Sequence, residues 1–324
     1  MVTGAFGWLG RTLIRQLMPQ KREIVCVDFS EENTLKVPKF LKNYKKLKVV
    51  LGDIRNSNQF IKEFNGCDTV FNCAGLQHTK FTSDIYGVNR DGTANLLRSC
   101  IKAKVPKFIH VSSCSVHGEN IDIKNQITEK TRLKPIHHIA KSKAQGESLI
   151  DKISKGSKIK TIILRPAAFY GTKPSKNRID LVEKIRKDFV VTFGKNGFLR
   201  SYVDIEKVAD ALLLAEKYGK HGGTYLIGDE NPITTLQLYE YIADELNVKL
   251  KLIRLPTIIS RVFEKITYVA GEFNIHFGIG TTIGEFGRHI FFSSEKAIKE
   301  LKYKPHESSE KGLREMARSA ITSH

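Results

Sequence analysis

Glycines recur at a short spacing at the start of the chain. Residues Thr3 to Gly10 read TGAFGWLG, a TGxxGxxG pattern between an apolar start and an amphipathic stretch. Glycines in such a turn let the backbone bend tightly, let a pyrophosphate approach the amides at a helix N-terminus, and let the helix pack close to a sheet. The pattern predicts a dinucleotide-binding turn; an ordinary tight turn is the alternative.

An acidic residue stands where such a turn needs one. Asp28 ends the next apolar run, where a carboxylate can accept hydrogen bonds from both ribose hydroxyls and would repel a 2′-phosphate. This position favours NAD over NADP, although an Asp that only caps a helix is the alternative. Further on, Asp53 and Ile54 of a GDI segment could meet the adenine, and the small residues Cys73, Ala74 and Gly75 would let the dinucleotide lie against the sheet.

The elements that must position these residues alternate along the first half. Short β-branched runs predict strands over Glu23–Val27, Lys48–Leu51, Thr69–Cys73, Phe108–Ser112 and Lys160–Leu164. Helical patterns separate them, including Trp8 to Leu17 and Val88–Ala103. This order predicts an α/β fold, a doubly wound parallel sheet of the Rossmann type.

After Arg165, the regular alternation of predicted strands and helices ends. We expect helices near 179–187 and 205–218, a strand near 224–227, and a helix from Thr234 or Thr235 to Leu246. The prediction is a dinucleotide-binding domain over 1–166, with a return segment near 204–228, and a smaller mixed C-terminal substrate domain over 167–324. After Pro256, apolar residues share one helical face from Ile258 to Val269, and we expect this face to pack in a core or pocket wall rather than on a membrane surface.

Composition limits the function classes. The hydrophobic fraction is 41%, and no apolar run is long enough to cross a membrane, so we expect a soluble protein. The 5 cysteines lack metal-binding spacing, which favours free thiols in a reducing cytoplasm and predicts no metal site. The 53 Lys and Arg exceed the 34 Asp and Glu, giving a net charge of +19. We assign this excess mainly to solvated surface, with nucleic acid or an acidic membrane surface as partners that we do not favour.

Together the motifs resemble a known family. TGAFGWLG, Asp28, GDI, NCAG, VNRDGT, VSSCSVHG, SKAQGE, LRPAAFYG and RSYVDIEKVADA follow one another over nearly the whole chain. This order is similar to that of the extended short-chain dehydrogenase/reductase family, also called the NAD-dependent epimerase/dehydratase family. The resemblance implies that Trp8 and Leu9 in the first turn, and Pro166, join the glycines in binding the cofactor.

The resemblance also implies an active site of Ser or Thr, Tyr and Lys. Ser113 matches the serine that hydrogen-bonds the substrate oxygen, and Lys143 matches the lysine that holds the nicotinamide ribose and lowers the pKa of the tyrosine. The tyrosine, the family's general acid/base, falls at Ile139, and no tyrosine occurs between Tyr86 and Tyr170. Because isoleucine cannot transfer a proton, catalysis loses a contribution of about 10² to 10⁴ in rate.

Three explanations remain open for this replacement. The chain could bind the cofactor with little turnover, or another group could take the proton, or the substrate or a water could supply it. His78 and His117 are candidates for the second explanation because they follow the fourth and fifth strands at the carboxyl edge of the sheet; a structural or exposed histidine is the alternative for each. His138 should point away from the site, and the pair His137 and His138 should be exposed.

Different residues of the sequence indicate different substrate classes. Ala168 stands where sugar-nucleotide members have Asn, whereas Arg200 matches their diphosphate-binding arginine. The LRPAAFYG motif and the apolar stretch after Pro256 resemble the hydroxysteroid dehydrogenase and dihydroflavonol reductase branch. We place Cys114 and Ile139 with these residues at the substrate.

The resulting prediction is an NAD-dependent oxidoreductase acting on a secondary alcohol or ketone. The alternatives are a nucleotide-sugar epimerase or dehydratase, and a non-catalytic NAD-binding sensor or nucleic-acid-binding protein. The resemblance allows a homodimer through the helices near 88–103 and 140–153. Because only Met1 and Val2 precede the TG motif, we expect an unusually short first strand and a natural chain that begins earlier.

Overall fold

The computed structural model describes residues 1–31, 41, 43–77, 79–120, 122–187, 189–277 and 283–322.

The central sheet holds seven parallel strands. The strands are β1 (Val2–Thr3), β2 (Ile24–Asp28), β3 (Leu47–Leu51), β4 (Thr69–Asn72), β5 (Lys107–Val111), β6 (Lys160–Pro166) and β11 (Gly223–Ile227), in the order β11-β6-β5-β4-β1-β2-β3. The chain winds outward from β1 to β3 and then from β4 to β11 in the other direction, so the switch point lies between β1 and β4.

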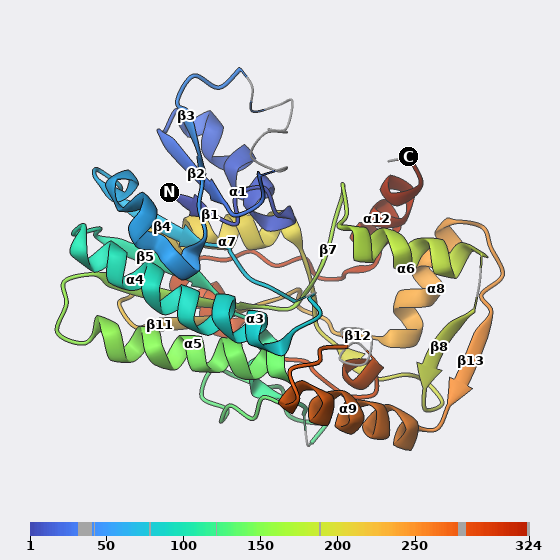
Figure 1. Ribbon diagram of the computed structural model, residues 1–324. Coiled ribbons are helices and arrows are strands. Elements are labelled where there is room, and N and C mark those ends of the chain that lie inside the picture. The colour runs from blue at the N-terminus through green and yellow to red at the C-terminus, as the bar shows by residue number, and fades with distance from the viewer. Residues whose placement is uncertain are drawn as a thin grey trace.

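Helices cover both faces of the sheet (Figure 1). One face carries α1 (Trp8–Leu17), continued by η1 (Met18–Gln20), together with α7 (Ile205–Tyr218) and α11 (Glu295–Leu301). The other face carries η3 (Ile54–Phe64), η4 (Gly87–Gly92), α4 (Thr93–Lys102) and α5 (His138–Ser154), with α3 (Thr82–Tyr86) packed on α5 and η4. The predicted doubly wound fold is confirmed.

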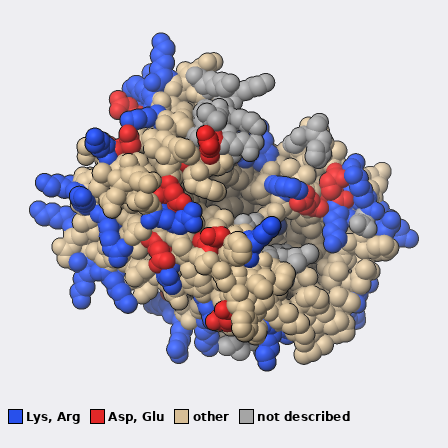
Figure 2. Space-filling view, in the orientation of Figure 1, with Lys and Arg blue, Asp and Glu red and all other residues tan. Residues whose placement is uncertain are grey.

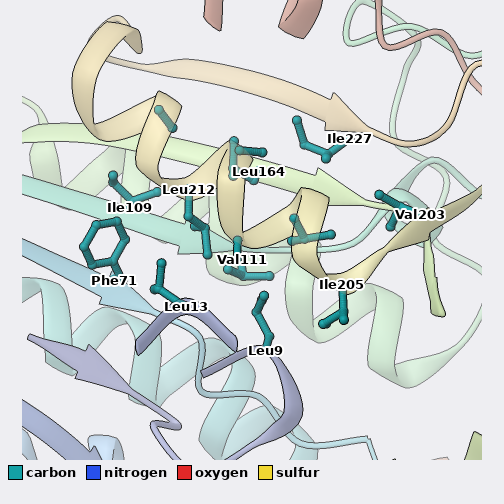
Figure 3. Close-up of a cluster of buried hydrophobic side chains, with 14 of the residues drawn as sticks. Leu9, Leu13, Phe71, Ile109, Val111, Leu164, Val203, Ile205, Leu212 and Ile227 are labelled. Atoms are coloured by element: carbon teal, nitrogen blue, oxygen red, sulfur yellow. The ribbon is translucent and has the colours of Figure 1, made fainter. Parts of the chain in front are cut away.

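Burial on both faces explains the strand sequences. All four residues of β4 are buried, as are most of those in β6, so these strands read as continuous apolar runs rather than alternating ones. Figure 3 shows the core between the sheet and the pair α1 and α7, where Leu13 and Leu212 meet Phe71, Ile109 and Leu164. This packing fixes the N-terminus of α1 at the carboxyl edge of the sheet.

Smaller elements form the rest of the molecule. The helices are α6 (Lys176–Lys187), α8 (Thr235–Glu245), α9 (Thr257–Glu272) and α12 (Glu310–Thr322), and the two-stranded sheets pair β7 (Ala168–Tyr170) with β10 (Tyr202–Asp204), β9 (Leu199–Arg200) with β12 (Ile233–Thr234), and β8 (Val190–Phe193) with β13 (Leu252–Leu255). A short 3-10 helix, η5 (Cys114–His117), follows β5. Figure 2 shows the molecule hollowed near the centre of one face.

Most predicted elements are confirmed within a residue or two, including the cap of α8, where Thr234 and Gln237 form a capping box. The short first strand is also confirmed. Two predictions about side chains are wrong. His137 and His138 are buried rather than exposed, and the apolar face of α9 from Ile258 to Val269 is largely exposed rather than packed.

Within the described part of the chain, no helix has the length and apolar composition that a membrane crossing requires. The boundary at residue 166 between two domains stays a prediction.

Candidate functional site

A first cavity of about 370 Å³ opens at the switch point of the sheet. Eight predicted cofactor residues line it: Gly4, Gly7, Asp28, Asp53, Ile54, Cys73, Ala74 and Gly75. They come from the carboxyl ends of β1 to β4 and the segments that follow, which is where parallel α/β sheets bind ligands. The structure therefore brings together residues that are far apart in the sequence.

The glycines make room for close backbone approach. Gly4 has φ +60°, and a Cβ there would lie 2.8 Å from the Cα of Ala74. A Cβ on Gly10 would lie 2.2 Å from the carbonyl oxygen of Gly4, so this glycine lets α1 pack against the turn. At the start of α1, the N-cap residue is Gly7, and no side chain caps the helix.

Asp28 is held rigidly at the end of β2. Its Oδ2 accepts a hydrogen bond from the amide of Phe6 at 3.0 Å, and its Oδ1 accepts one from the amide of Ser30 at 3.2 Å. Asp53 instead begins η3 and accepts hydrogen bonds from Arg55, whose proximity offsets the effect of burial and lowers the pKa of Asp53. Both carboxylates lie at the wall of the first cavity.

A second cavity of about 650 Å³ lies at the carboxyl ends of β5 and β6, beside η5 and the first turns of α5. Predicted site residues that line it are Trp8, Ser113, Cys114, Ile139, Lys143, Pro166, Ala168 and Arg200. Burial raises the pKa of the Cys114 thiol to about 12, so it is a neutral part of the wall at pH 7.

Lys143 lies between the two cavities. It lines the second cavity, and its Nζ would be 2.9 Å from a Cβ on Gly75, which lines the first. The side chain is only 5% exposed, and Nζ donates a hydrogen bond to the carbonyl oxygen of Val111 at 2.9 Å. Burial lowers the pKa of Lys143 to about 8. The Lys143 ammonium group therefore lies at the wall of the second cavity and close to Gly75 of the first.

Ile139 faces the second cavity from the first turn of α5. Asn89 fixes this part of the helix, because its side chain exchanges hydrogen bonds with the backbone of Leu76 and donates one to Ser142 Oγ at 3.1 Å. Ser113 begins η5, where its Oγ accepts from the amide of Ser115 and lies 2.9 Å from Ser115 Oγ. The wall therefore presents a serine hydroxyl, an ammonium group and the aliphatic side chain of Ile139.

Among the described residues, three predicted site residues line neither cavity. His117 is buried and accepts a hydrogen bond from Arg165 at 3.0 Å, and burial followed by the charge of Arg165 lowers its pKa to about 4. We therefore withdraw His117 as a proton donor. Leu9 and Gly10 are buried in the packing of α1. His78 lies outside the described residues.

Sequence reasoning missed part of the second cavity. His137 caps α5 by accepting from the amide of Ala140, and its Nε2 donates to Glu285 Oε1 at 2.9 Å. Burial alone would raise the pKa of Glu285, but His137 and Arg200 lower it to about 2. Arg178 and Tyr202 also line this cavity. Glu285 and Arg178 lie outside every recognised motif, so no signal marked them, whereas Tyr202 sits in RSYVDI and was open to prediction.

His138 points away from both cavities, as predicted. Its Nδ1 lies 3.1 Å from the hydroxyl of Tyr86, and its Nε2 lies 3.0 Å from the backbone oxygen of Tyr268 in α9. Among the described residues, no group of three His, Cys, Asp or Glu side chains is arranged to hold a metal ion.

Comparison with known proteins places the chain in a family. Residues 1–257 match the model of the 3-beta hydroxysteroid dehydrogenase/isomerase family. The chain belongs to this family. Its sequence is 25% identical to short-chain dehydrogenase/reductase family 42E member 1 of Danio rerio, over 94% of this chain and 84% of the relative. It is 23% identical to 4-hydroxy-2-methyl-3-oxo-4-farnesyl-3,4-dihydroquinoline-1-oxide ketoreductase of Stigmatella aurantiaca, over 96% of this chain and 93% of that one.

Solved structures share the fold. UDP-glucose 4-epimerase of Thermus thermophilus, solved in complex with NAD, superposes with a TM-score of 0.79 at 19% identity, and the match covers 100% of this chain and 99% of the epimerase chain. The family is thus one of dehydrogenases and isomerases built on the fold that epimerases of the extended short-chain type also use.

Proposed function

We propose that the chain is an NAD-dependent oxidoreductase that acts on a secondary alcohol or ketone of a largely apolar substrate. The observation that carries this proposal is the position of Lys143, buried at the junction of a cavity lined by the glycine turn and a cavity lined by Ser113. Bound NAD would supply the hydride acceptor, and NADH the donor. The family match supports this activity.

The residues of the first cavity fit a dinucleotide. The approach of Gly4 to Ala74 leaves no space for a side chain, and the uncapped amides at the start of α1 are free to bind a pyrophosphate. Asp28 lies where it would accept hydrogen bonds from the adenosine ribose, and the same carboxylate would repel the extra phosphate of NADP. Lys143 would hold the nicotinamide ribose.

Ser113 and Lys143 would act on the substrate without a tyrosine. The Ser113 hydroxyl would donate a hydrogen bond to the substrate oxygen, and the charge of Lys143 would stabilise negative charge on that oxygen. With Ile139 in place and His117 withdrawn, we propose that a water or the substrate itself carries the proton. The expected consequence is slow turnover.

The test is NADH fluorescence with the purified chain, NAD and a panel of hydroxylated apolar alcohols. We expect slow NADH formation with at least one alcohol and a loss of about 10²-fold or more in Lys143→Met. The matched control is Lys141→Met, which changes the outer side of the same helix, where Lys141 contacts Tyr268. Equal rates in the wild type and Lys143→Met would contradict the proposed role of Lys143.

A second candidate, a nucleotide-sugar epimerase or dehydratase, is favoured by unused donors in the second cavity. Within the described part of the chain, no carboxylate lies within ion-pair distance of the partly buried Arg178 guanidinium, whose pKa is lowered by burial. The buried Arg200 Nε and Tyr202 hydroxyl also have no hydrogen-bond partner among the described residues. Three donors in one cavity fit an anionic group such as a diphosphate.

Calorimetric titration with UDP and with UDP-glucose tests this candidate. Micromolar binding that weakens at least about tenfold in Arg178→Met, but not in the exposed control Lys176→Met, would support a nucleotide substrate. Lys176 pairs with Asp180 on the surface of the same helix. Failure of both nucleotides to bind would remove this candidate and leave the apolar alcohol.

We also propose a cytoplasmic homodimer. Cytoplasmic placement rests on the five cysteines, which are all free thiols. The dimer would form through α4 and α5, which lie side by side on one face of the sheet (Figure 1). Sedimentation equilibrium tests the dimer, and a monomer at micromolar concentration would contradict it.

A further inference from the structure

The amino edge of the central sheet lies opposite the two cavities. The seven strands are parallel, so all of them begin at this edge, and the segments that enter them lie there side by side. Lysines that are dispersed along the sequence come together in these segments. We call the following exposed lysines, which precede β2, β3, β5, β6 and β11, the basic edge: Lys21, Lys46, Lys104, Lys155, Lys158 and Lys220.

Pairing of the strands fixes the positions of these segments relative to one another. The Nζ of Lys46, just before β3, donates to the carbonyl oxygen of Lys21, before β2, at 3.1 Å. Two more lysines, Lys107 and Lys160, are paired in register at the first positions of β5 and β6. The basic edge therefore extends from the outer strand β3 to the outer strand β11, a span of about 30 Å.

Two further lysines extend the basic edge at the ends of α7 and α11. The Nζ atoms of Lys217 and Lys302 lie 5.0 Å and 4.8 Å from the ring centroid of Tyr218. Both lysines are exposed. Figure 2 shows mainly Lys and Arg side chains along the left margin, where Figure 1 places the ends of α4 and α5. Positive charge is therefore concentrated at this edge.

The backbone gives no reason for lysine at three of these positions. The φ angle is +55° at Lys21, +56° at Lys104 and +63° at Lys302. Residues with a Cβ rarely adopt this left-handed conformation, and Gly or Asn is the usual residue there. Because the turns would form more readily with glycine, we attribute the lysines to the charge that they bring to this edge.

Acidic and large apolar side chains are few at this edge. Within the described residues of the segments that enter the strands, the exposed acids are Glu23 and Asp68. Lys220 also lies 3.5 Å from Glu300. None of the exposed large apolar residues in the described part of the chain lies in these segments. Since insertion into a bilayer requires apolar side chains, the surface is better suited to a hydrated polyanion.

We propose that the basic edge binds duplex nucleic acid through its phosphate backbone. A duplex carries about one negative charge per 1.7 Å, and one of its turns is about 34 Å long, close to the span of the basic edge. A single phosphate or a short acidic segment would meet only one or two of these lysines. Phosphate contacts carry no sequence information, so we expect binding without sequence preference.

The position of the basic edge separates this binding from the candidate site. Both cavities open at the carboxyl ends of the strands, so a duplex at the amino edge would leave them accessible. This inference therefore does not depend on the proposed oxidoreductase activity.

Fluorescence anisotropy of a labelled DNA duplex of about two helical turns tests the proposal with the full chain. We expect micromolar binding at about 50 mM salt and at least about tenfold weaker binding at about 200 mM, because bound lysines release counterions from the duplex. A second duplex of unrelated sequence should bind equally well.

Two triple variants with the same change in net charge locate the binding surface. Lys104→Glu/Lys155→Glu/Lys158→Glu places three anions in the basic edge and should weaken binding at least about tenfold. The matched control, Lys195→Glu/Lys249→Glu/Lys265→Glu, changes exposed lysines of the C-terminal elements and should bind within about twofold of the wild type.

Three results would overturn the proposal. The first is no binding of either duplex by the wild type at low salt. The second is an equal loss of binding in the two triple variants, which would assign the effect to net charge alone. The third is binding to vesicles of phosphatidylcholine and phosphatidylserine in equal parts, but not to a duplex, which would assign the edge to lipid. NAD titration of both variants checks that they are folded and keeps this inference separate from the cofactor site.

Discussion

At the scale of single residues, we expect Ile139, at the position of the family's tyrosine, to limit how fast the site can work. Ile139 faces the cavity that Lys143 and Ser113 also line, so the position of the usual acid/base is retained while its hydroxyl is absent. We propose that the lysine is retained because it would also hold the cofactor ribose. Loss of proton transfer therefore does not make the lysine dispensable.

Restoring the hydroxyl should restore rate. We expect Ile139→Tyr to speed NADH formation by about 10²-fold, because general acid/base catalysis commonly contributes that much. Ile139→Phe is the matched control, with the same ring but no hydroxyl, and should not speed the reaction. Cofactor affinity should be similar in all three proteins. Equal rates for the tyrosine and phenylalanine variants would show that the missing hydroxyl is not limiting.

The pKa of Lys143 predicts how stability changes with pH. Burial lowers this pKa from 10.5 to about 8, so between pH 8 and 10.5 the unfolded chain holds a proton that the folded chain has released. Stability then rises with pH in this window. The free energy of unfolding of the wild type, relative to Lys143→Met, should therefore increase from pH 8 to pH 10. Urea unfolding at both pH values measures it, and a constant or falling difference would contradict the shift.

At the scale of elements, a buried ion pair ties α5 to the sheet. Glu147 on α5 accepts from Arg165 Nε on β6 at 3.0 Å, and both side chains are almost fully buried. Arg165 also donates to His117 in η5. This network holds the helix that carries Ile139 and Lys143 against the strand that leads to Pro166.

Breaking this pair should destabilise the fold. We expect Glu147→Gln to lower the free energy of unfolding by about 3 kcal/mol, because it leaves a buried guanidinium uncompensated. The control is Glu295→Gln, which breaks an exposed pair with Lys299 and should leave stability unchanged. Urea unfolding of the two variants measures their free energies of unfolding. Equal losses in the two variants would show that the buried pair stabilises the fold no more than the exposed pair does.

Elements were predictable where sequence periodicity and burial coincide. Strands such as β4 and β6 are buried on both faces, and the TG turn and the cap of α8 have local signatures. The cavity position of Asp28 was predictable because it ends the apolar run of β2, and that of Lys143 because its SKAQGE motif resembles the family's. The outward orientation of α9 was not predictable, because periodicity shows that a helix has an apolar face but not what that face contacts. Glu285 and Arg178 reach the second cavity through tertiary packing alone.

At the scale of the whole molecule, the candidate cofactor residues gather at the switch point between β1 and β4. The glycine turn, Asp28 and Gly75 gather there from separate βα units, and the smaller C-terminal elements close the second cavity against it. Lys143 connects the two spaces. This arrangement supports our proposal of one site that binds a dinucleotide beside a substrate.

Calorimetric titration of the chain with NAD and with NADP tests this central claim most directly. We predict that NAD binds with micromolar affinity and that NADP binds at least about tenfold more weakly, because Asp28 repels the 2′-phosphate. Asp28→Asn should reduce the difference between the two cofactors. Failure of both to bind, or equal or tighter binding of NADP, would contradict the account.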